Sequence, residues 1–188
     1  MDVAAVARAV GGTLVDCPDP TALVTGAAAD SRLVEPGDLY IAIAGERVDG
    51  HDFAGAARAA GAVVTLGSRP TGGPTIVIND DPVDALGRLA THVLAELPDA
   101  RVVAVTGSSG KTTTKDLLAG LLGDLGPTVA PVGSFNTEVG LPLTILRATQ
   151  ETRFLVLEMG ASGLGHIARL CQIAAPDVSV VLNVGSAH

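Results

Sequence analysis

The second half of the chain alternates short β-branched apolar runs with segments whose apolar residues recur at helical spacing. The runs at 102–105, 154–157 and 178–184 are typical of parallel strands that are buried on both faces. Leucines at helical spacing follow the first run, a short helix is expected at 142–146, and Ser162 is a candidate N-cap for a helix ending near 174. Repeated strand–helix–strand units predict a mostly parallel sheet with right-handed crossovers.

The first half is predicted to be a smaller, mixed α/β domain. An opening helix at 3–10 ends at Gly11-Gly12, and a later helix begins with Asp81 as N-cap and Pro82 in its first turn. Because that helix ends at Pro98, shortly before the next apolar run, we expect two domains, at 1–98 and 99–188. The remaining elements expected in the first domain are strands at 39–44, 62–66 and 75–79 and a helix at 53–60.

The sequence GSSGKTT at 107–113 lies between the first apolar run and the helix with leucines. Gly107 and Gly110 allow successive N–H groups to turn inward, toward an anion at the positive end of that helix. Lys111 supplies a cation for the β- and γ-phosphates, and Thr112 a hydroxyl for Mg²⁺. The pattern predicts a nucleotide-phosphate loop of a short form, because the longer consensus has a glycine where this chain has valine. A glycine-rich turn with a solvated lysine is the alternative. The predicted nucleotide-binding residues in this loop are Gly107, Ser108, Ser109, Gly110, Lys111, Thr112 and Thr113.

Glu158 follows the apolar run at 154–157, so it is expected at the carboxyl end of a strand, where ligands bind in open α/β sheets. Mg²⁺ prefers one or two protein oxygens together with phosphates and water. Thr112 and Glu158 are therefore the natural ligands for a nucleotide-bound ion. A surface carboxylate at a strand end is the alternative, and His188 on its own is interpreted as an exposed residue.

Polar residues also gather where strands of the first domain are expected to end. Asp30, Ser31 and Arg32 could bind the polar groups of a ligand, and another polar, glycine-bearing stretch at 46–52 follows the strand at 39–44. From the residues alone, solvated loops and a helix cap at Asp52 are favoured.

Composition narrows the classes of partner. With 12 Lys and Arg against 20 Asp and Glu, the net charge of -8 argues against a general nucleic-acid footprint and against attraction to anionic membranes. Cys17 and Cys171 lie far apart in sequence and have no partner at metal-ligand spacing, so no disulfide is expected and a reducing cytoplasm fits. No export signal and no apolar run of about 18 residues is found, so membrane insertion is not expected.

Several segments, at the spacing they have here, resemble the ATP-dependent Mur ligases of peptidoglycan synthesis. In the second half these are GSSGKTTTKD, GSFNTEVGLPLTILR, LVLEMGA and the ending VLNVGSAH. In the first half, ADSRLVEPGDLYIAIAGERVDGHDF resembles the uridine-nucleotide domain of some family members. The resemblance covers essentially the whole chain. It is strongest to the members that join D-Ala-D-Ala to UDP-N-acetylmuramoyl-tripeptide, with the members that add a single amino acid as rivals.

The resemblance implies roles for individual residues. Lys111 and Thr112 would contact phosphates and Mg²⁺, and Asn136 would lie near the nucleotide and metal. Glu158 and His188 would be metal ligands, His188 to a second Mg²⁺, and the catalytic residues would be Lys111, Glu158 and His188. Asp30, Ser31 and Arg32 become candidates for binding the UDP-sugar substrate.

The resemblance also implies the reaction. ATP would activate the tripeptide carboxylate as an acyl phosphate, which the amine of D-Ala-D-Ala would attack, releasing ADP and phosphate. A full-length form is expected to be a cytoplasmic monomer. Family members continue well beyond the length of this chain, so the chain alone is not expected to ligate. A nucleotide-binding module that never ligates is the alternative from a different class.

Overall fold

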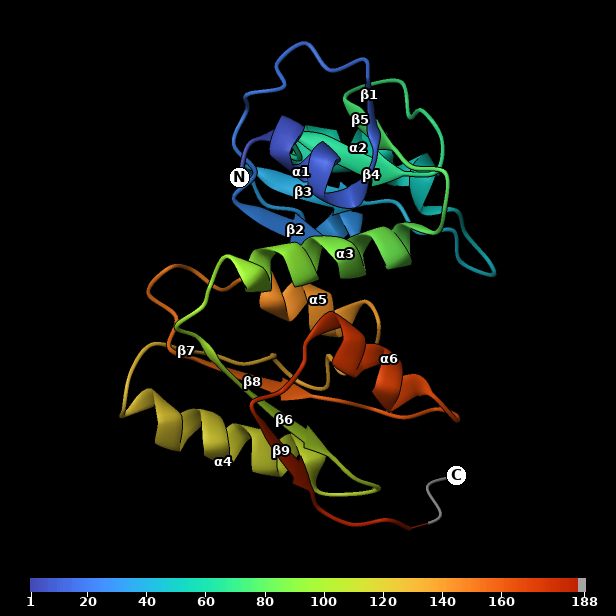
Figure 1. Cartoon of the computed structure of the whole chain (residues 1–188). Coiled ribbons are helices and arrows are strands. Elements are labelled where there is room, and N and C mark those ends of the chain that lie inside the picture. Colours follow the sequence, from blue (N-terminus) through green and yellow to red (C-terminus); the bar gives the residue numbers. More distant parts are fainter. Residues whose placement is uncertain (186–188) are drawn as a thin grey trace. The chain divides into compact units, whose positions relative to one another are not determined.

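The computed structural model describes residues 1–185 (Figure 1). The chain divides into two compact units, one from Met1 to Leu89 and one that begins at Ala90. The division falls inside α3 (Pro82–Ala95). Each unit has its own sheet, and each is described here by itself.

The first unit contains a five-stranded mixed sheet in the order β1-β5-β4-β3-β2. The edge strand β1 runs antiparallel to β5, and the other neighbours are parallel. Asp2 caps α1, and Asp81 accepts a hydrogen bond from the Val83 N–H at the start of α3. The strands are β1 (Thr13–Val15), β2 (Gly26–Ala28), β3 (Asp38–Ile41), β4 (Val64–Gly67) and β5 (Thr75–Val77), and the helices are α1 (Val3–Val10), η1 (Ser31–Leu33), η2 (Gly50–Phe53) and α2 (Ala54–Ala60).

The second unit contains an all-parallel sheet in the order β7-β8-β6-β9. Helix α4 lies on one face of this sheet, and α5 and α6 lie on the other (Figure 1). The apolar core includes Leu141 and Ile145 of α5 and Leu170 of α6, packed with buried residues of β6 and β8. The strands are β6 (Arg101–Thr106), β7 (Thr128–Val129), β8 (Phe154–Glu158) and β9 (Val178–Val181), and the helices are α4 (Lys111–Gly123), α5 (Gly140–Ile145) and α6 (His166–Ile173).

The predicted fold class is confirmed: a mixed α/β first part is followed by a parallel sheet with flanking helices. The β-branched runs predicted the buried strands of the second unit because side chains on both faces of β6 and β8 are covered. Cys17 and Cys171 are both free, as expected. None of the helices between residues 1 and 185 is both long and apolar enough to cross a membrane.

Three predicted element ends in the second unit are wrong. Ser162 does not cap α6, because its hydroxyl bonds to the ring Nδ1 of His166 at 2.7 Å, and α6 starts only at His166 after a glycine-rich stretch. Helix α5 starts at Gly140, whose N–H donates to the Thr137 hydroxyl, two residues before the predicted start. The last strand ends at Val181, short of the predicted Val184.

The predicted cap at Asp52 is also wrong. Asp49 caps η2 by accepting a hydrogen bond from the His51 N–H, whereas Asp52 pairs with Arg69 at 3.2 Å. An aspartate immediately before the turn reaches the free N–H groups of the turn, and one inside it does not.

Candidate functional site

The predicted phosphate loop connects the carboxyl end of β6 to the first turn of α4. Gly107 has φ 142°, and a Cβ there would lie 3.1 Å from Leu182 Cβ and 3.2 Å from the Asn183 nitrogen. Only glycine fits between β6 and the residues that follow β9. The loop therefore passes tightly against the end of a neighbouring strand.

The start of α4 presents hydrogen-bond donors at this loop. Thr114 N–H donates to the Gly110 carbonyl, whereas the N–H groups of Lys111, Thr112 and Thr113 have no partner among residues 1–185. The Lys111 ammonium lies over the loop and donates to the Gly107 carbonyl at 2.8 Å. Free N–H groups, a helix N-terminus and a cation in one place form an anion-binding arrangement.

Asn183 holds the loop in this form, and sequence reasoning missed it. Its side-chain Oδ1 accepts hydrogen bonds from the N–H groups of Ser108 at 3.0 Å and Ser109 at 3.1 Å. The Ser108 hydroxyl also bonds to the backbone of Gly185. These partners lie more than 70 residues apart in sequence, so no local pattern indicates them.

Glu158, the last residue of β8, is the centre of the site. Its side chain is 1 % exposed, because β8 pairs with β6 and the loop lies beside its end. Thr112 Oγ1 donates to Glu158 Oε2 at 2.9 Å, and Asn136 Nδ2 donates to Glu158 Oε1 at 2.7 Å. The structure thus brings together three residues that were singled out from the sequence at distant positions.

Asn136 is fixed independently of its side-chain bond. Its carbonyl accepts a hydrogen bond from Gly160 N–H at 2.9 Å, and a Cβ on Gly160 would lie 2.9 Å from Asn136 Cγ. The Gly160 position therefore has to remain small for Asn136 to reach Glu158. The sequence signal for this contact, a glycine shortly after a strand-end carboxylate, was not used.

The oxygen atoms around Glu158 suit a hard cation. Glu158 is a buried carboxylate that makes no ion pair with a cationic side chain of the described residues; its recorded partners are a hydroxyl and an amide. Residues 1–185 contain no cluster of three or more His, Cys, Asp or Glu side chains that could hold a metal. A Mg²⁺ ion that takes Thr112 and Glu158 as ligands, with phosphate oxygens and water completing its shell, fits this donor set. His188 lies outside the described residues.

A cavity of about 830 Å³ opens beside the loop. Its volume is within the range of small-molecule sites. Gly107, Ser108 and Lys111 line it together with residues that follow β8 and β9, including Ser162 and Asn183. The cavity thus lies at the carboxyl ends of the parallel strands, where ligands bind in such sheets.

The predicted substrate residues of the first unit follow β2. Asp30 caps η1, and its carboxylate accepts hydrogen bonds from the Arg32 side chain, which lowers the pKa of Asp30 to about 2. The side chain of Arg32 is 85 % exposed. Ser31 is the first residue of η1, so the three residues lie together, and Asp30 and Arg32 pair with each other.

A second polar group lies after β3 in the same unit. His51 is buried, donates from Nδ1 to Asp49 at 2.6 Å and accepts the Ser68 N–H at Nε2, a pattern that fits the neutral ring with its proton on Nδ1. The hydrogen bond from His51 N–H, followed by those from the Arg69 and His51 side chains, holds the pKa of Asp49 far below its usual range. Burial, then the charges of Asp30 and Asp49, raises the pKa of Tyr40. Because β2 and β3 are parallel, Asp30 after β2 and Asp49 after β3 follow the same carboxyl edge of the sheet.

Two family models match this chain. One, described as the Mur ligase middle domain, matches residues 105–188, and one described as the Mur ligase family, catalytic domain, matches residues 23–93. The chain belongs to the Mur ligase family. The middle-domain match contains the phosphate loop, Asn136 and Glu158, and the other match contains Asp30 and Asp49.

Individual Mur ligases resemble most or all of the chain. The UDP-N-acetylmuramoyl-tripeptide--D-alanyl-D-alanine ligase of Mycobacterium bovis is 46% identical over 100% of this chain, and the match covers 42% of that relative. A crystal structure of MurF from Acinetobacter baumannii superimposes with a TM-score of 0.91 at 34% identity, over 100% of this chain and 41% of that one. The MurF ligase of Thermotoga maritima in complex with ADP superimposes with a TM-score of 0.76 at 44% identity, over 88% and 39%. The chain thus spans about two fifths of the length of these Mur ligases.

Proposed function

We propose that this chain is the UDP-substrate-binding and phosphate-loop part of an ATP-dependent ligase. The ligase would join D-Ala-D-Ala to UDP-N-acetylmuramoyl-tripeptide in peptidoglycan synthesis. The observation that carries the proposal is the contact of Thr112 and Asn136 with the buried Glu158, directly beside a glycine loop with free N–H groups. The names of the similar ligases, and the ADP complex of one of them, support the same chemistry.

In this proposal the residues of the second unit hold ATP by its phosphates. The N–H groups of Lys111 to Thr113 and the Lys111 ammonium neutralise negative charge on the β- and γ-phosphates. Thr112 and Glu158 hold Mg²⁺, which when bound offsets the charge that develops as the γ-phosphoryl group moves. His188 is proposed as a ligand of a second Mg²⁺. Asn136 keeps the Glu158 carboxylate oriented by donating to Oε1.

The proposed reaction has two transfers. A carboxylate oxygen of the tripeptide takes the γ-phosphoryl group of ATP, and ADP leaves. The amine of D-Ala-D-Ala then attacks the acyl carbon, loses a proton, and inorganic phosphate leaves as the new amide forms. Such transfers depend on holding three reactants in reacting geometry, and positioning supplies a large part of the rate.

The first unit is proposed to bind the UDP-linked substrate. Asp30, Ser31 and Arg32 lie together after β2, and the Arg32 guanidinium is exposed and suited to a phosphate or carboxylate. We propose domains at 1–98 and 99–188, so that α3 belongs to the substrate-binding domain. A cytoplasmic, monomeric full-length form without a nucleic-acid partner completes the proposal.

A ligation assay tests it. The chain is incubated with ATP, Mg²⁺, the UDP-tripeptide and D-Ala-D-Ala, alone and as a fusion to the part of the M. bovis ligase that lies beyond the matched region. We expect pentapeptide product only from the fusion, and none from a Lys111→Ala fusion. A soluble fusion that binds ADP but forms no pentapeptide would contradict the proposed reaction, and sustained turnover by the chain alone would show that it needs nothing further.

A further inference from the structure

The buried residue of α4 is a lysine. Lys115 is 1 % exposed, whereas Leu117, Leu121 and Leu125 of the same helix and the turn after it are all more than 60% exposed. Lysine is almost never fully buried without partners, because its ammonium loses hydration. A methionine or leucine would fill the same space without that cost. The hydrogen bonds that the lysine makes must therefore offset that cost.

The Lys115 ammonium is fully satisfied. It donates to the carbonyl of Pro131 at 2.9 Å, to the carbonyl of Gly133 at 3.3 Å and to the Asp116 carboxylate at 2.5 Å. An ammonium has three N–H donors, so each donor has one acceptor. Two of the three acceptors belong to the backbone of the segment that follows β7. Lys115 thus joins α4 to this segment.

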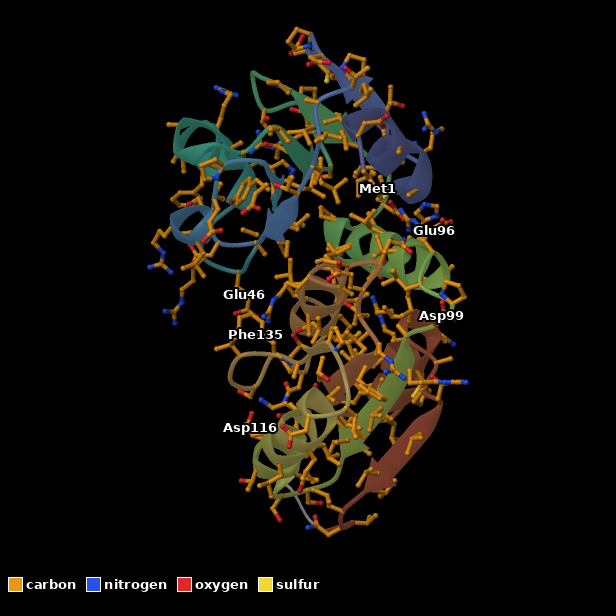
Figure 2. All side chains as sticks on the ribbon, turned by 90° about the vertical axis from the view of Figure 1, so that its left-hand side faces the viewer. Met1, Glu46, Glu96, Asp99, Asp116 and Phe135 are labelled. Carbon is orange, nitrogen blue, oxygen red and sulfur yellow. The ribbon has the colours of Figure 1, made fainter. Side chains whose placement is uncertain are left out.

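That segment leads directly to Asn136. Gly133, which Lys115 holds, lies three residues before Asn136, the residue that donates to Glu158 Oε1. Figure 2 labels Phe135, next to Asn136 in this segment, and Asp116, next to Lys115 on α4. Among the described residues, the hydrogen bonds recorded from α4 to residues 130–139 all come from Lys115.

Helix α4 therefore reaches Glu158 by two routes. Thr112 and Lys115 are three residues apart and share one face of the helix. Thr112 donates to Glu158 Oε2 directly, and Lys115 holds the segment that delivers Asn136 to Glu158 Oε1. One rigid helix fixes both hydrogen-bond partners of the buried carboxylate.

We propose that Lys115 is a positioning residue, which holds segment 131–136 against α4 so that Asn136 donates to Glu158. The inference concerns the ligand-free geometry, and it rests on the proposed function only where Mg²⁺ is invoked. The competing explanation is that Gly160 N–H, which donates to the Asn136 carbonyl, places Asn136 by itself and Lys115 merely fills space.

The first test needs no ligand. Lys115→Met keeps the length of the side chain and removes its donors, and Asp116→Asn is the matched control because it leaves both carbonyl contacts in place. In Lys115→Met we expect the Asn136 side-chain amide protons to exchange with solvent about tenfold faster than in the wild type, which corresponds to the loss of the one hydrogen bond to Glu158. In the control we expect the wild-type exchange rate. Equal exchange rates in Lys115→Met and the wild type would overturn the inference. If Lys115→Met does not fold, Lys115→Leu, which also lacks donors, decides on the same measurement.

The second test uses Mg²⁺ and ADP, with affinities followed by NMR titration. The measured quantity is the factor by which Mg²⁺ raises the affinity for ADP. Lys115→Met is expected to lower this factor about tenfold, because outer contacts of a metal ligand are worth that much. In an Asn136→Ala background the same substitution should lower it no further. An undiminished effect in that background would show that Lys115 does not act through Asn136.

The two tests distinguish a failure of the proposed metal site from a failure of the positioning role of Lys115. A wild-type chain whose ADP affinity is unaffected by Mg²⁺ would contradict the proposed metal site. In that case the exchange rates of Asn136 in the ligand-free chain still decide whether Lys115 positions it.

Discussion

Replacing Glu158 with glutamine separates the charge of the site from its shape. Glutamine has nearly the same volume, and its oxygen can accept from Asn136 Nδ2 while its amide donates to the Thr112 hydroxyl. Two charge-assisted hydrogen bonds become neutral ones, a loss of about 1 kcal/mol each. Removing a buried charge that has no ionic partner among residues 1–185 raises the free energy of unfolding by about the same amount or more. We therefore expect the free energy of unfolding to stay within about 2 kcal/mol of the wild type or to rise.

The same substitution should abolish the effect of Mg²⁺. A divalent ion about 2 Å from a unit charge gains about 4 kcal/mol even at the dielectric constant of water. Desolvation of the ion offsets part of that gain. We therefore expect the factor by which Mg²⁺ raises ADP affinity to fall at least about 100-fold, which corresponds to about 2.7 kcal/mol.

Isothermal titration or NMR titration with ADP, with and without Mg²⁺, measures this factor, and thermal unfolding measures stability. Glu151→Gln is the matched control, because it removes the same charge from an exposed turn. Glu158→Gln with an undiminished Mg²⁺ effect would refute the metal-ligand assignment. Loss of the metal-free affinity for ADP as well would show that Glu158 holds the loop rather than the ion.

Three further predictions follow from contacts in the two units. Gly160→Ala pushes a methyl group against the carboxamide that bonds to the buried carboxylate, so it should destabilise by about 1–3 kcal/mol in thermal unfolding, whereas Gly120→Ala in open space on α4 should stabilise by about 0.5–1 kcal/mol. The Asp30 carboxyl should titrate near pH 2 in an NMR titration, and Arg32→Ala, which removes the largest cause, should move the midpoint back toward 3.8. Because this pKa is lowered on folding, the stability it contributes is present above pH 3.8 and is lost as pH falls through about 2, and a flat profile over that range would contradict the pairing. Lys111→Ala should leave the circular dichroism spectrum unchanged while abolishing pentapeptide formation by the fusion, and near-normal turnover would contradict the phosphate-loop assignment.

The parts of the site that could be predicted are those encoded within short stretches. The glycines, lysine and threonine of the loop lie between a β-branched run and a helix. The glycines act through the backbone, and the lysine and threonine act through side chains that the same short loop positions. Glu158 was predicted as a site residue because the end of a buried parallel strand is a defined place in the fold. A resemblance to the Mur ligases then drew attention to Asn136, whose contact with Glu158 the structure shows.

The parts that could not be predicted depend on hydrogen-bond partners that the local pattern does not indicate. Asn183 binds the loop across more than 70 residues, and nothing in VLNVGSAH itself indicates that contact. Ser162 has the residue type of an N-cap, but its hydroxyl bonds to the ring of His166 instead. Two of the three residues between them are glycines. For Asn183 the deciding contact is tertiary, and for Ser162 it is a side chain four residues away that bonds to the same hydroxyl.

The two faces of the second sheet are built differently, and the site depends on that difference. On one face, α5 and α6 pack on β6 and β8 through apolar side chains. On the other face, the contacts that α4 makes through Thr112 and Lys115 are hydrogen bonds, and its leucines are exposed or half-buried. Apolar packing tolerates small shifts at little cost, whereas hydrogen bonds to a buried carboxylate and to two carbonyls are directional. The geometry of the Glu158 site therefore depends on directional hydrogen bonds from the α4 face, in addition to the apolar packing that holds the sheet.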